Sequence, residues 1–379
     1  MKINLPNATG KMLPFKLTTT PLKVRAPKKP FNRVAFAAAH VVVDPYSSSG
    51  SVDWKATLAY RRYLLKQGFG IAEAMDTSQR GMGLDWPSAL ELIKRSIEDA
   101  GEKATLIYSG CGTDHLAPQD AHSLDDVMRA YDTQLNAIQK LGGRIILMAS
   151  RALVRVAKSP EDYLKVYAHV LQQADHPMIL HWLGPMFDPA LAGYWGQDNF
   201  AQSMETCLAM IKANQSKVDG IKISLLDAQK EVTMRRALPV SVKMYTGDDF
   251  NYAELIAGDA HGFSHALLGI FDAIAPAASQ ALAALAAGNE KKFHALLAPT
   301  VPLSRLIFSA PTQYYKTGIV FLAWLNGHQD HFIMVNGAQS ARPLPYFVEI
   351  FKLAEAAGLL AKPDLAVKRM KQFLSVYGC

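Results

Sequence analysis

The sequence contains too few cysteines for a disulfide framework. Among 379 residues there are three, Cys111, Cys207 and Cys379, and no pair has the Cys-x-x-Cys spacing. An odd number of widely spaced cysteines supports neither a network of disulfides nor a zinc ribbon. We therefore expect free thiols and a location in the reducing cytoplasm.

Several signals of other protein classes are also missing. No glycine-rich Gly-x-Gly-x-x-Gly or Walker motif occurs, which argues against nucleotide binding in an open α/β sheet. No apolar run follows a basic start, so we expect no signal peptide. The longest apolar stretch, residues 266–288, contains Asp272 and Pro276 and is rich in alanine. Buried helices fit this stretch better than a membrane span, and we expect no membrane association.

Acidic residues are absent before Asp44, and this absence explains most of the net charge of +7. The eight basic residues of this segment are Lys2, Lys11, Lys16, Lys23, Arg25, Lys28, Lys29 and Arg33. The rest of the chain has 32 basic and 33 acidic residues, so we expect no nucleic-acid partner. Five prolines argue against a helix here. We expect a solvated extension, or a short hairpin packed over the base of the main domain; contact with a polyanion is the alternative.

From residue 33 onward, short apolar runs alternate with amphipathic helical patterns. The runs predict strands at 33–43, 70–74, 104–109, 144–149, 178–182, 220–224, 241–246 and 261–264. The patterns between them predict helices at 53–66, 86–99, 124–141, 160–173, 200–214, 226–238 and 252–257. Strands that alternate with helices predict a parallel sheet.

Eight such units without a phosphate-binding fingerprint favour a closed (β/α)8 TIM barrel. We expect a basic N-terminal extension over residues 1–32, the barrel over residues 33–270, and a C-terminal helical layer over residues 271–379. In such barrels the functional groups lie at the C-terminal ends of the strands, because the loops there converge on one face. Polar residues follow the predicted strands at His40 and Asp44; Asp76, Thr77 and Ser78; Ser109, Asp114 and His115; Arg151; His181; Lys222 and Ser224; Asp248 and Asp249; and His261, Ser264 and His265.

Lys222 differs from the others because it lies inside an apolar strand, between Ile221 and Ile223. If its side chain faces the barrel interior, the ammonium loses hydration and its pKa falls. A neutral amine is the form that attacks a carbonyl carbon. The alternative is a structural lysine that points outward or pairs with a carboxylate.

Short motifs around Lys222 occur in the order known from one enzyme family. They are Asp44–Trp54, Asp76–Trp86, Gly220–Ser224, Thr246–Asp249, Gly262–Ser264 and Ala341–Pro345. They resemble, in turn, a Thr-Pro-Phe stretch, a Gly-Thr-Thr-Gly-Glu loop, a Gly-Ile-Lys segment, a Gly-Asp-Asp turn, a Gly-x-x-Ser strand and an Arg-Pro-Pro segment. Over about 300 residues the chain thus resembles the dihydrodipicolinate synthase and N-acetylneuraminate lyase family of class I aldolases, as a divergent branch. The resemblance implies a Schiff base at Lys222, no cofactor, and a homodimer or homotetramer.

The departures from the family pattern point to a substrate other than pyruvate. His181 stands where the family has a proton-shuttling tyrosine, and histidine can do the same work near neutral pH. The carboxylate-binding hydroxyl pair corresponds to Thr77 and Ser78, but the flanking glycine and glutamate are replaced by Asp76 and Arg80. Arg151 lies near the missing fourth-strand tyrosines and is a candidate anion partner. His181 could instead be a buried histidine satisfied by a backbone carbonyl.

Three further residues, Ser224, Asp248 and Ser264, are expected to contact the substrate. Asp248 with Asp249 could place a carboxylate near Lys222, or could cap the next helix. His261 and His265 could bind a metal ion with Asp44, Asp114 or His181.

We therefore expect a Schiff-base lyase that acts on a small-molecule carbonyl substrate, either an oxo acid or a keto-sugar derivative. Lys222 would be the nucleophile and His181 the acid and base. One alternative is a metal-dependent barrel isomerase or lyase of sugar metabolism, which a chelator would inactivate. The other is a non-catalytic binding protein on an aldolase scaffold, in which Lys222 would be ion-paired and unreactive.

Overall fold

The computed structural model describes residues 1–47 and 51–379. Residues 48–50, which belong to the Asp44–Trp54 motif, lie outside the described residues. The chain divides into two compact units whose segments alternate along the sequence. One unit comprises residues 33–39 and 70–268, and the other comprises residues 1–32, 40–69 and 269–379.

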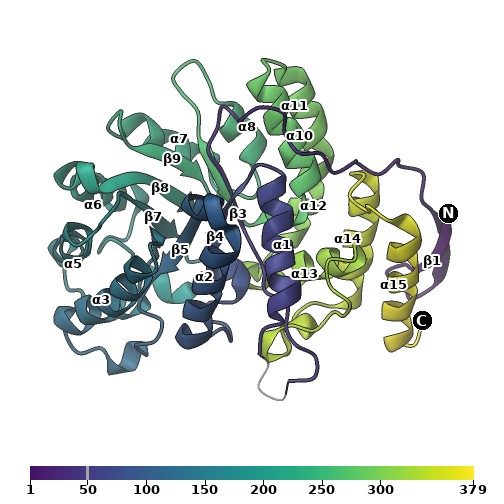
Figure 1. The fold of residues 1–379 in the computed structure, drawn as a ribbon, viewed down its shortest axis with the longest axis horizontal. Helices are drawn as coiled ribbons and strands as arrows, with labels where there is room; N and C mark the ends of the chain where they lie inside the picture. Colours follow the sequence, from purple (N-terminus) through teal and green to yellow (C-terminus); the bar gives the residue numbers. More distant parts are fainter. Residues whose placement is uncertain (48–50) are drawn as a thin grey trace. The chain divides into compact units, whose positions relative to one another are not determined.

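The first unit contains a closed barrel of eight parallel strands in the order β10-β3-β4-β5-β6-β7-β8-β9 (Figure 1). The strands are β3 (Ala35–Ala38), β4 (Gly70–Glu73), β5 (Ile107–Cys111), β6 (Arg144–Leu147), β7 (Met178–Leu183), β8 (Val218–Ser224), β9 (Lys243–Thr246) and β10 (His265–Leu268). This confirms the predicted TIM barrel.

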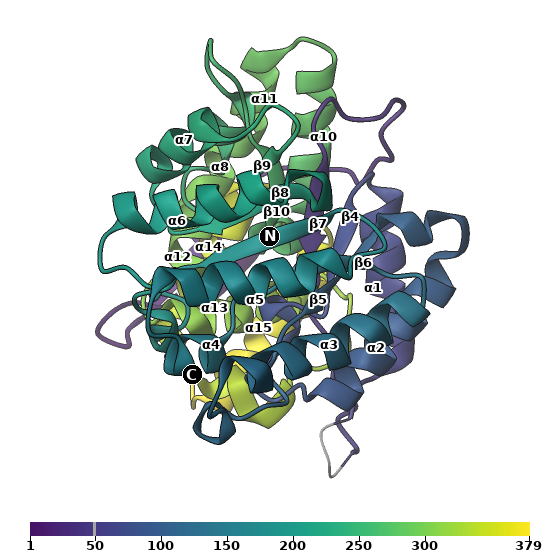
Figure 2. The ribbon, with the colours of Figure 1, turned by 90° about the vertical axis from the view of Figure 1, so that its left-hand side faces the viewer.

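Helices connect successive strands of this unit and cover the outside of the barrel. They are α2 (Trp86–Ala100), α3 (Leu124–Lys140), α4 (Arg151–Val156), α5 (Pro160–Gln172), α6 (Phe200–Ala213), α7 (Ala228–Ala237) and α8 (Tyr252–Ala257). Figure 2 shows α3 and α5 running alongside each other in this outer layer. Side-chain caps start several of them: Asp85 accepts a hydrogen bond from the backbone N–H of Ser88 in α2, and Asn199 accepts one from Gln202 in α6.

The predicted eighth strand, 261–264, is wrong. The strand is β10, His265–Leu268, where Ala266–Leu268 pair with β3. Gly262 has a φ of 144°, and an isolated bridge joins it to Asp259, so residues 259–262 form a turn. Gly269 separates the strand from the following helix, and the apolar run Ala266–Leu268 just before this glycine is the strand.

The second unit begins with an antiparallel hairpin, β1 (Lys2–Pro6) and β2 (Met12–Lys16). Its helices are α1 (Trp54–Lys66), α9 (Ile270–Ala273), α10 (Ala275–Ala286), α11 (Glu290–Leu297), α12 (Val301–Ile307), α13 (Tyr315–Leu325), α14 (Leu344–Ala356) and α15 (Pro363–Val376). Phe15 of the hairpin packs edge-on against Phe351 of α14. A hairpin was one of the two predicted forms of the N-terminal segment, and its packing partner is a C-terminal helix.

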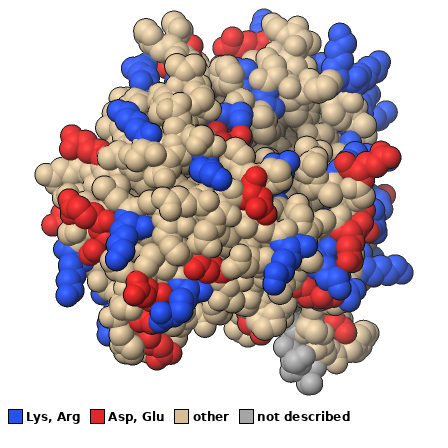
Figure 3. All heavy atoms as spheres, turned by 60° about the vertical axis from the view of Figure 1, so that its left-hand side comes forward, with Lys and Arg blue, Asp and Glu red and all other residues tan. Residues whose placement is uncertain are grey.

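The charges of the surface follow the near-neutral balance of the chain after its N-terminal segment. On the lower half of the face in Figure 3, basic and acidic side chains lie interspersed. Several pairs are local, such as Arg129 with Asp126 and Arg95 with Glu91. Exposed pairs of this kind contribute little to stability.

No single helix among the described residues is both long and apolar enough to cross a membrane. One bent pair, Glu290–Ile307 with Thr312–Leu325, meets the requirements of length and composition only when its two parts are taken together.

The barrel interior is filled by apolar side chains from different strands, among them Phe36, Ile146, Ile179, Tyr245 and Leu267. Each of these five is at most 3% exposed. Such a layer has no room to collapse around a missing side chain, so truncations here are costly.

We predict that Ile146→Ala lowers the free energy of unfolding by about 2–5 kcal/mol, because it removes buried methyl groups and leaves a cavity. Urea denaturation measures this loss. Val240→Ala, at a fully exposed position, is the control and should change stability by less than about 0.5 kcal/mol. Equal effects of the two substitutions would contradict a tightly packed barrel interior.

Candidate active site

Lys222 faces the interior of the barrel. Side chains alternate along a strand, and Ile179 of β7 and Tyr245 of β9 belong to the interior core. His181, two residues after Ile179, therefore also points inward. Lys222 is the register partner of both His181 and Tyr245, so its side chain lies on the same face. The sequence pattern alone had left open whether Lys222 points inward or outward.

The amine of Lys222 is desolvated and lies within electrostatic reach of two carboxylates. The residue is 8% exposed. Burial lowers the pKa of the Lys222 amine below its ordinary value of 10.5, and the negative charges of Asp249 and Asp76 partly oppose this effect. More of the neutral, nucleophilic amine is therefore present near neutral pH than for a lysine in water.

His181 lies on the strand next to Lys222 and is 1% exposed. Its Nε2 is 3.2 Å from Oγ of Ser224, while its Nδ1 has no hydrogen-bond partner among the described residues. Burial, together with the positive charge of Lys222, lowers the pKa of His181 well below 6.5. The imidazole is thus neutral at pH 7 and has one nitrogen available to exchange a proton.

The turn after β9 places Asp249 beside Lys222. Asp248 accepts hydrogen bonds from the backbone N–H groups of Phe250 (2.8 Å) and Asn251 (3.0 Å) and from the Asn251 side chain (2.8 Å). Its carboxylate therefore holds the backbone just before α8. This is the helix-capping role that the sequence analysis gave as the alternative for Asp248. Asp249, and not Asp248, is the carboxylate that acts on Lys222.

Gly247 gives this turn its close approach to β8. A Cβ atom at this position would lie 2.8 Å from Cε of Lys222 and 2.6 Å from the carbonyl oxygen of Ile223, and would also collide with Oγ of Ser224. Its own backbone N–H donates to the Ile223 carbonyl at 2.9 Å. Only glycine fits against the lysine here.

A cavity of about 270 Å³ opens at the C-terminal ends of β4 to β7. This volume is close to the lower limit of about 300 Å³ that is usual for small-molecule sites. The charged or titratable residues that line it are Asp76, Arg80, Asp114, Arg151, His181 and Asp188. Two residues that interact electrostatically with Lys222, His181 and Asp76, thus line the cavity.

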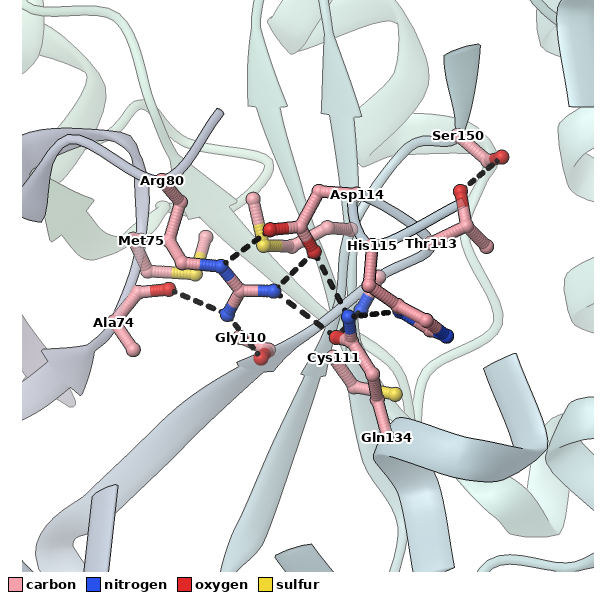
Figure 4. Close-up of polar contacts among 12 residues, drawn as sticks. Ala74, Met75, Arg80, Gly110, Cys111, Thr113, Asp114, His115, Gln134 and Ser150 are labelled. Carbon is pink, nitrogen blue, oxygen red and sulfur yellow. Dashed lines mark hydrogen bonds and ion pairs between the residues drawn. The ribbon is translucent and has the colours of Figure 1, made fainter. Parts of the chain in front are cut away.

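Arg80 is fixed by all five of its N–H groups (Figure 4). Nε donates to Asp114 at 3.0 Å, and Nη1 donates to the carbonyl oxygens of Ala74 (3.2 Å) and Gly110 (3.1 Å). Nη2 donates to Asp114 and, at 3.0 Å, to Oε1 of Gln134. Arg80 therefore joins the ends of β4 and β5 to α3, and its charge is neutralised by Asp114.

Gln134 extends this network and was missed by the sequence prediction. Its Oε1 also accepts from the backbone N–H of Gly112 at 2.8 Å, while its Nε2 contacts Asp114 and His115, each at 2.9 Å. Gln134 lies in the middle of α3, where the helical pattern predicts only a packing residue. No local motif indicates its role, because its partners are far away in the sequence.

The other predicted site residues take different positions. Arg151 begins α4, lines the cavity, and pairs with Asp188 at 2.5 Å. Thr77 and Ser78 are buried in the short helical turn η1 (Asp76–Ser78), and Oγ of Ser78 donates to the carbonyl oxygen of Met75 at 2.7 Å. Of this turn, Asp76 is the residue that lines the cavity.

Ser264 is not brought to this site. It precedes β10, at the opposite end of the strand from the C-terminal face, and its Oγ donates to Glu231 at 2.7 Å. The misplaced eighth strand explains the earlier expectation for Ser264. Burial raises the pKa of Glu231 to about 8, which fits a carboxyl group enclosed between secondary-structure elements.

The metal site that the sequence offered as an alternative has no counterpart in the described part of the chain. There, no three His, Cys, Asp or Glu side chains converge closely enough to hold a metal ion. His265, one of the proposed ligands, lies at the start of β10, where its Nδ1 accepts a hydrogen bond from the backbone N–H of Val34 at 2.9 Å.

Comparison with known proteins places the chain in a family. A family model described as "Protein of unknown function (DUF993)" matches residues 3–379. The chain belongs to this family. It is also 22% identical, over 281 residues, to 4-hydroxy-tetrahydrodipicolinate synthase of Synechococcus elongatus, a match that covers 74% of this chain and 82% of that enzyme.

Solved structures of the dihydrodipicolinate synthase family share the fold. The enzyme of Aquifex aeolicus matches with a TM-score of 0.67 and 12% identity, over 87% of this chain and 99% of that one. YagE of Escherichia coli K12, solved in complex with pyruvate, matches with a TM-score of 0.67 and 13% identity, over 86% and 99%. The enzyme of Acinetobacter baumannii, also complexed with pyruvate, matches with 0.64 and 20%, over 86% and 99%. The family is thus a distant relative of the dihydrodipicolinate synthases.

We predict that Gly247→Ala lowers stability by about 1–3 kcal/mol, because the added methyl group overpacks the contact with Ile223 and Lys222. Urea denaturation measures the loss. In the same variant, the rate at which an amine reagent labels Lys222 should differ from the rate in the wild-type protein. Gly112→Ala is the matched control for stability, since its added Cβ would meet neighbours at 3.6 Å or more. If both variants are equally stable, the close approach at Gly247 is not a constraint.

Proposed function

We propose that this protein is a lyase of the class I aldolase type, which forms a Schiff base between Lys222 and a small carbonyl compound. The observation that carries the proposal is the position of the amine. It is buried inside a parallel barrel, towards the C-terminal end of β8, and its pKa is lowered by desolvation. Catalytic lysines that attack carbonyl groups are activated in this way.

The chemistry follows from the neutral amine. The nitrogen lone pair attacks the carbonyl carbon, a C–N bond forms, and the carbonyl oxygen leaves as water after two proton transfers. The product is a protonated imine. For a C–O bond β to the original carbonyl, a base first removes an α-proton, the C–H electron pair forms an enamine, and the enamine expels the oxygen with the C–O electron pair, so that water hydrolyses the unsaturated imine. When a C–C bond breaks, its electron pair moves toward the imine nitrogen and leaves an enamine. Protonation of the enamine carbon and hydrolysis by water then release the product and restore Lys222.

His181 is the proposed acid and base for these proton transfers. If its Nε2–H donates to Ser224, its Nδ1 carries a lone pair that can take the proton of a substrate hydroxyl as the C–C bond breaks. The imidazolium then returns a proton to the enamine carbon. The lowered pKa of His181 makes it a base that is neutral before each cycle and a strong acid once protonated.

The relatives support the choice of a small carbonyl compound. Two proteins of similar fold were solved with pyruvate, and the curated sequence relative is a 4-hydroxy-tetrahydrodipicolinate synthase. The cavity beside His181 has a volume suited to a molecule of this size or somewhat larger. An oxo acid and a keto-sugar derivative both meet these conditions.

We predict that borohydride traps a substrate imine on Lys222. The protein is incubated with small 2-oxo acids and keto sugars, reduced, and analysed by mass spectrometry of the intact chain and of its peptides. Trapping should become faster as pH rises, with a midpoint below 10.5, because burial lowers the pKa of the amine. A chelator should leave trapping unchanged.

Lys222→Arg is the matched variant for this experiment, since it keeps a long cationic side chain but cannot form the imine. It should give no adduct at residue 222. If the wild-type protein forms no adduct with any carbonyl compound, or forms adducts only at surface lysines, the Schiff-base proposal is wrong.

We predict that His181→Gln separates imine formation from proton transfer. The glutamine should keep trapping at Lys222 within about tenfold, but should slow the exchange of the substrate's α-protons with deuterated water by about 10²–10⁴-fold. Proton NMR of the carbonyl compound measures the exchange. In the wild-type protein the rate of exchange, divided by the rate of imine trapping at the same pH, should not fall between pH 8 and 6.5, because the lowered pKa of His181 keeps the imidazole neutral there. Equal losses of trapping and exchange in the variant would indicate a packing role for His181.

A further inference from the structure

The cavity lined by His181 and Asp76 has no surplus positive charge. Its lining contains three carboxylates, those of Asp76, Asp114 and Asp188, and two guanidinium groups, those of Arg80 and Arg151. A site built for an anionic substrate needs at least one cationic group whose charge is not already balanced by the protein.

Both arginines are paired with aspartates of the protein. Arg80 donates all five of its N–H groups to backbone carbonyls, Gln134 and Asp114, and it is 3% exposed. Arg151 pairs with Asp188 at 2.5 Å through its Nε, so that its charge is balanced as well. Once these two ion pairs are set aside, the charged group of the lining that is left is the carboxylate of Asp76. It forms no ion pair with an arginine in the described part of the chain.

Asp76 and Asp249 act on the same amine. Both lie close enough to Lys222 for their negative charges to favour its protonated form. A protonated imine at Lys222 carries the same positive charge and would be stabilised in the same way. The protein therefore supplies the counter-charge of the intermediate itself.

A 2-oxo acid would bring a carboxylate to the carbon next to the imine. That carboxylate would lie among the existing negative charges of Asp76 and Asp249, without an uncommitted cation to compensate. A neutral ketone or aldehyde has no such conflict, because the two aspartates alone balance its imine. Carboxylates that line a cavity also accept hydrogen bonds from hydroxyl groups.

We infer that the substrate is a neutral, polyhydroxylated carbonyl compound of the keto-sugar type, and that Asp76 selects it against 2-oxo acids. This inference rests on the proposed Schiff base at Lys222. A second feature of the site also points to a hydroxylated ligand: Nδ1 of His181, a 1% exposed residue of the cavity lining, has no hydrogen-bond partner among the described residues. A substrate hydroxyl group would satisfy it.

The test compares compounds of matched size. Dihydroxyacetone is paired with pyruvate, and erythrulose with 2-oxobutanoate, and each is trapped on Lys222 with borohydride. Every rate is divided by the rate at which the same compound is trapped by a free lysine derivative, which removes differences of intrinsic reactivity. In the wild-type protein the corrected rate should be at least about tenfold higher for the hydroxyketone of each pair, the ratio that corresponds to about 1.4 kcal/mol.

Asp76→Asn is the decisive variant, because it removes the charge and keeps the shape. It should shift the ratio toward the oxo acid by about tenfold, through slower trapping of dihydroxyacetone and faster trapping of pyruvate. Asp125→Asn, an exposed change on α3, is the matched control and should leave the ratio unchanged.

The possible failures can be told apart. If the wild-type protein traps pyruvate in preference, or if Asp76→Asn leaves the ratio unchanged, the assignment of the substrate class is overturned while the Schiff base at Lys222 stands. If none of the four compounds gives an adduct at Lys222, while the same compounds are trapped by the free lysine derivative, the proposed Schiff base and the inference built on it both fail.

Discussion

The desolvation of one amine is the physical constraint on which the candidate site depends. Inside the barrel, Lys222 cannot be hydrated like a surface lysine, and its pKa falls unless nearby negative charge compensates. Asp76 and Asp249 compensate only in part. The net effect is a pKa of the Lys222 amine below its ordinary value, which the proposed Schiff-base chemistry requires. The neighbouring His181 responds to the same burial by remaining neutral, so that the two groups do not compete for one proton.

The surrounding structure holds these charges in place without contributing to the reaction. Arg80 connects the ends of two strands to α3 through hydrogen bonds, and Asp248 holds the turn that carries Asp249 in the same way. Gly247 lets that turn approach the lysine closely. Each of these residues has all or most of its polar groups satisfied by the protein, which is what fixes the position of a group that must not move. They differ from His181, which keeps one nitrogen without a partner.

The sequence predicted the barrel well because its signals are periodic and local. Alternating apolar runs and amphipathic helices repeat eight times, and Lys222 could be recognised as a charge inside such a run. The failures have a different origin. Ser264 was misplaced because the strand was expected at residues 261–264 and lies at His265–Leu268, and this slip of four residues moved it to the wrong end of the barrel. Gln134 and the complete use of Arg80 depend on contacts between distant segments, which periodicity cannot reveal.

Charge balance then links the shape of the site to the chemistry it favours. An imine intermediate is a cation in a poorly hydrated space, and it must be balanced either by the substrate or by the protein. A 2-oxo acid balances its own imine, so a protein that binds one gains nothing from further carboxylates near the lysine. This chain has two aspartates acting on Lys222, and the cations that line the cavity are already paired. Asp76 stands where the resemblance to the dihydrodipicolinate synthases places a glycine. Under the proposed Schiff-base chemistry, this carboxylate favours a substrate that brings no negative charge of its own.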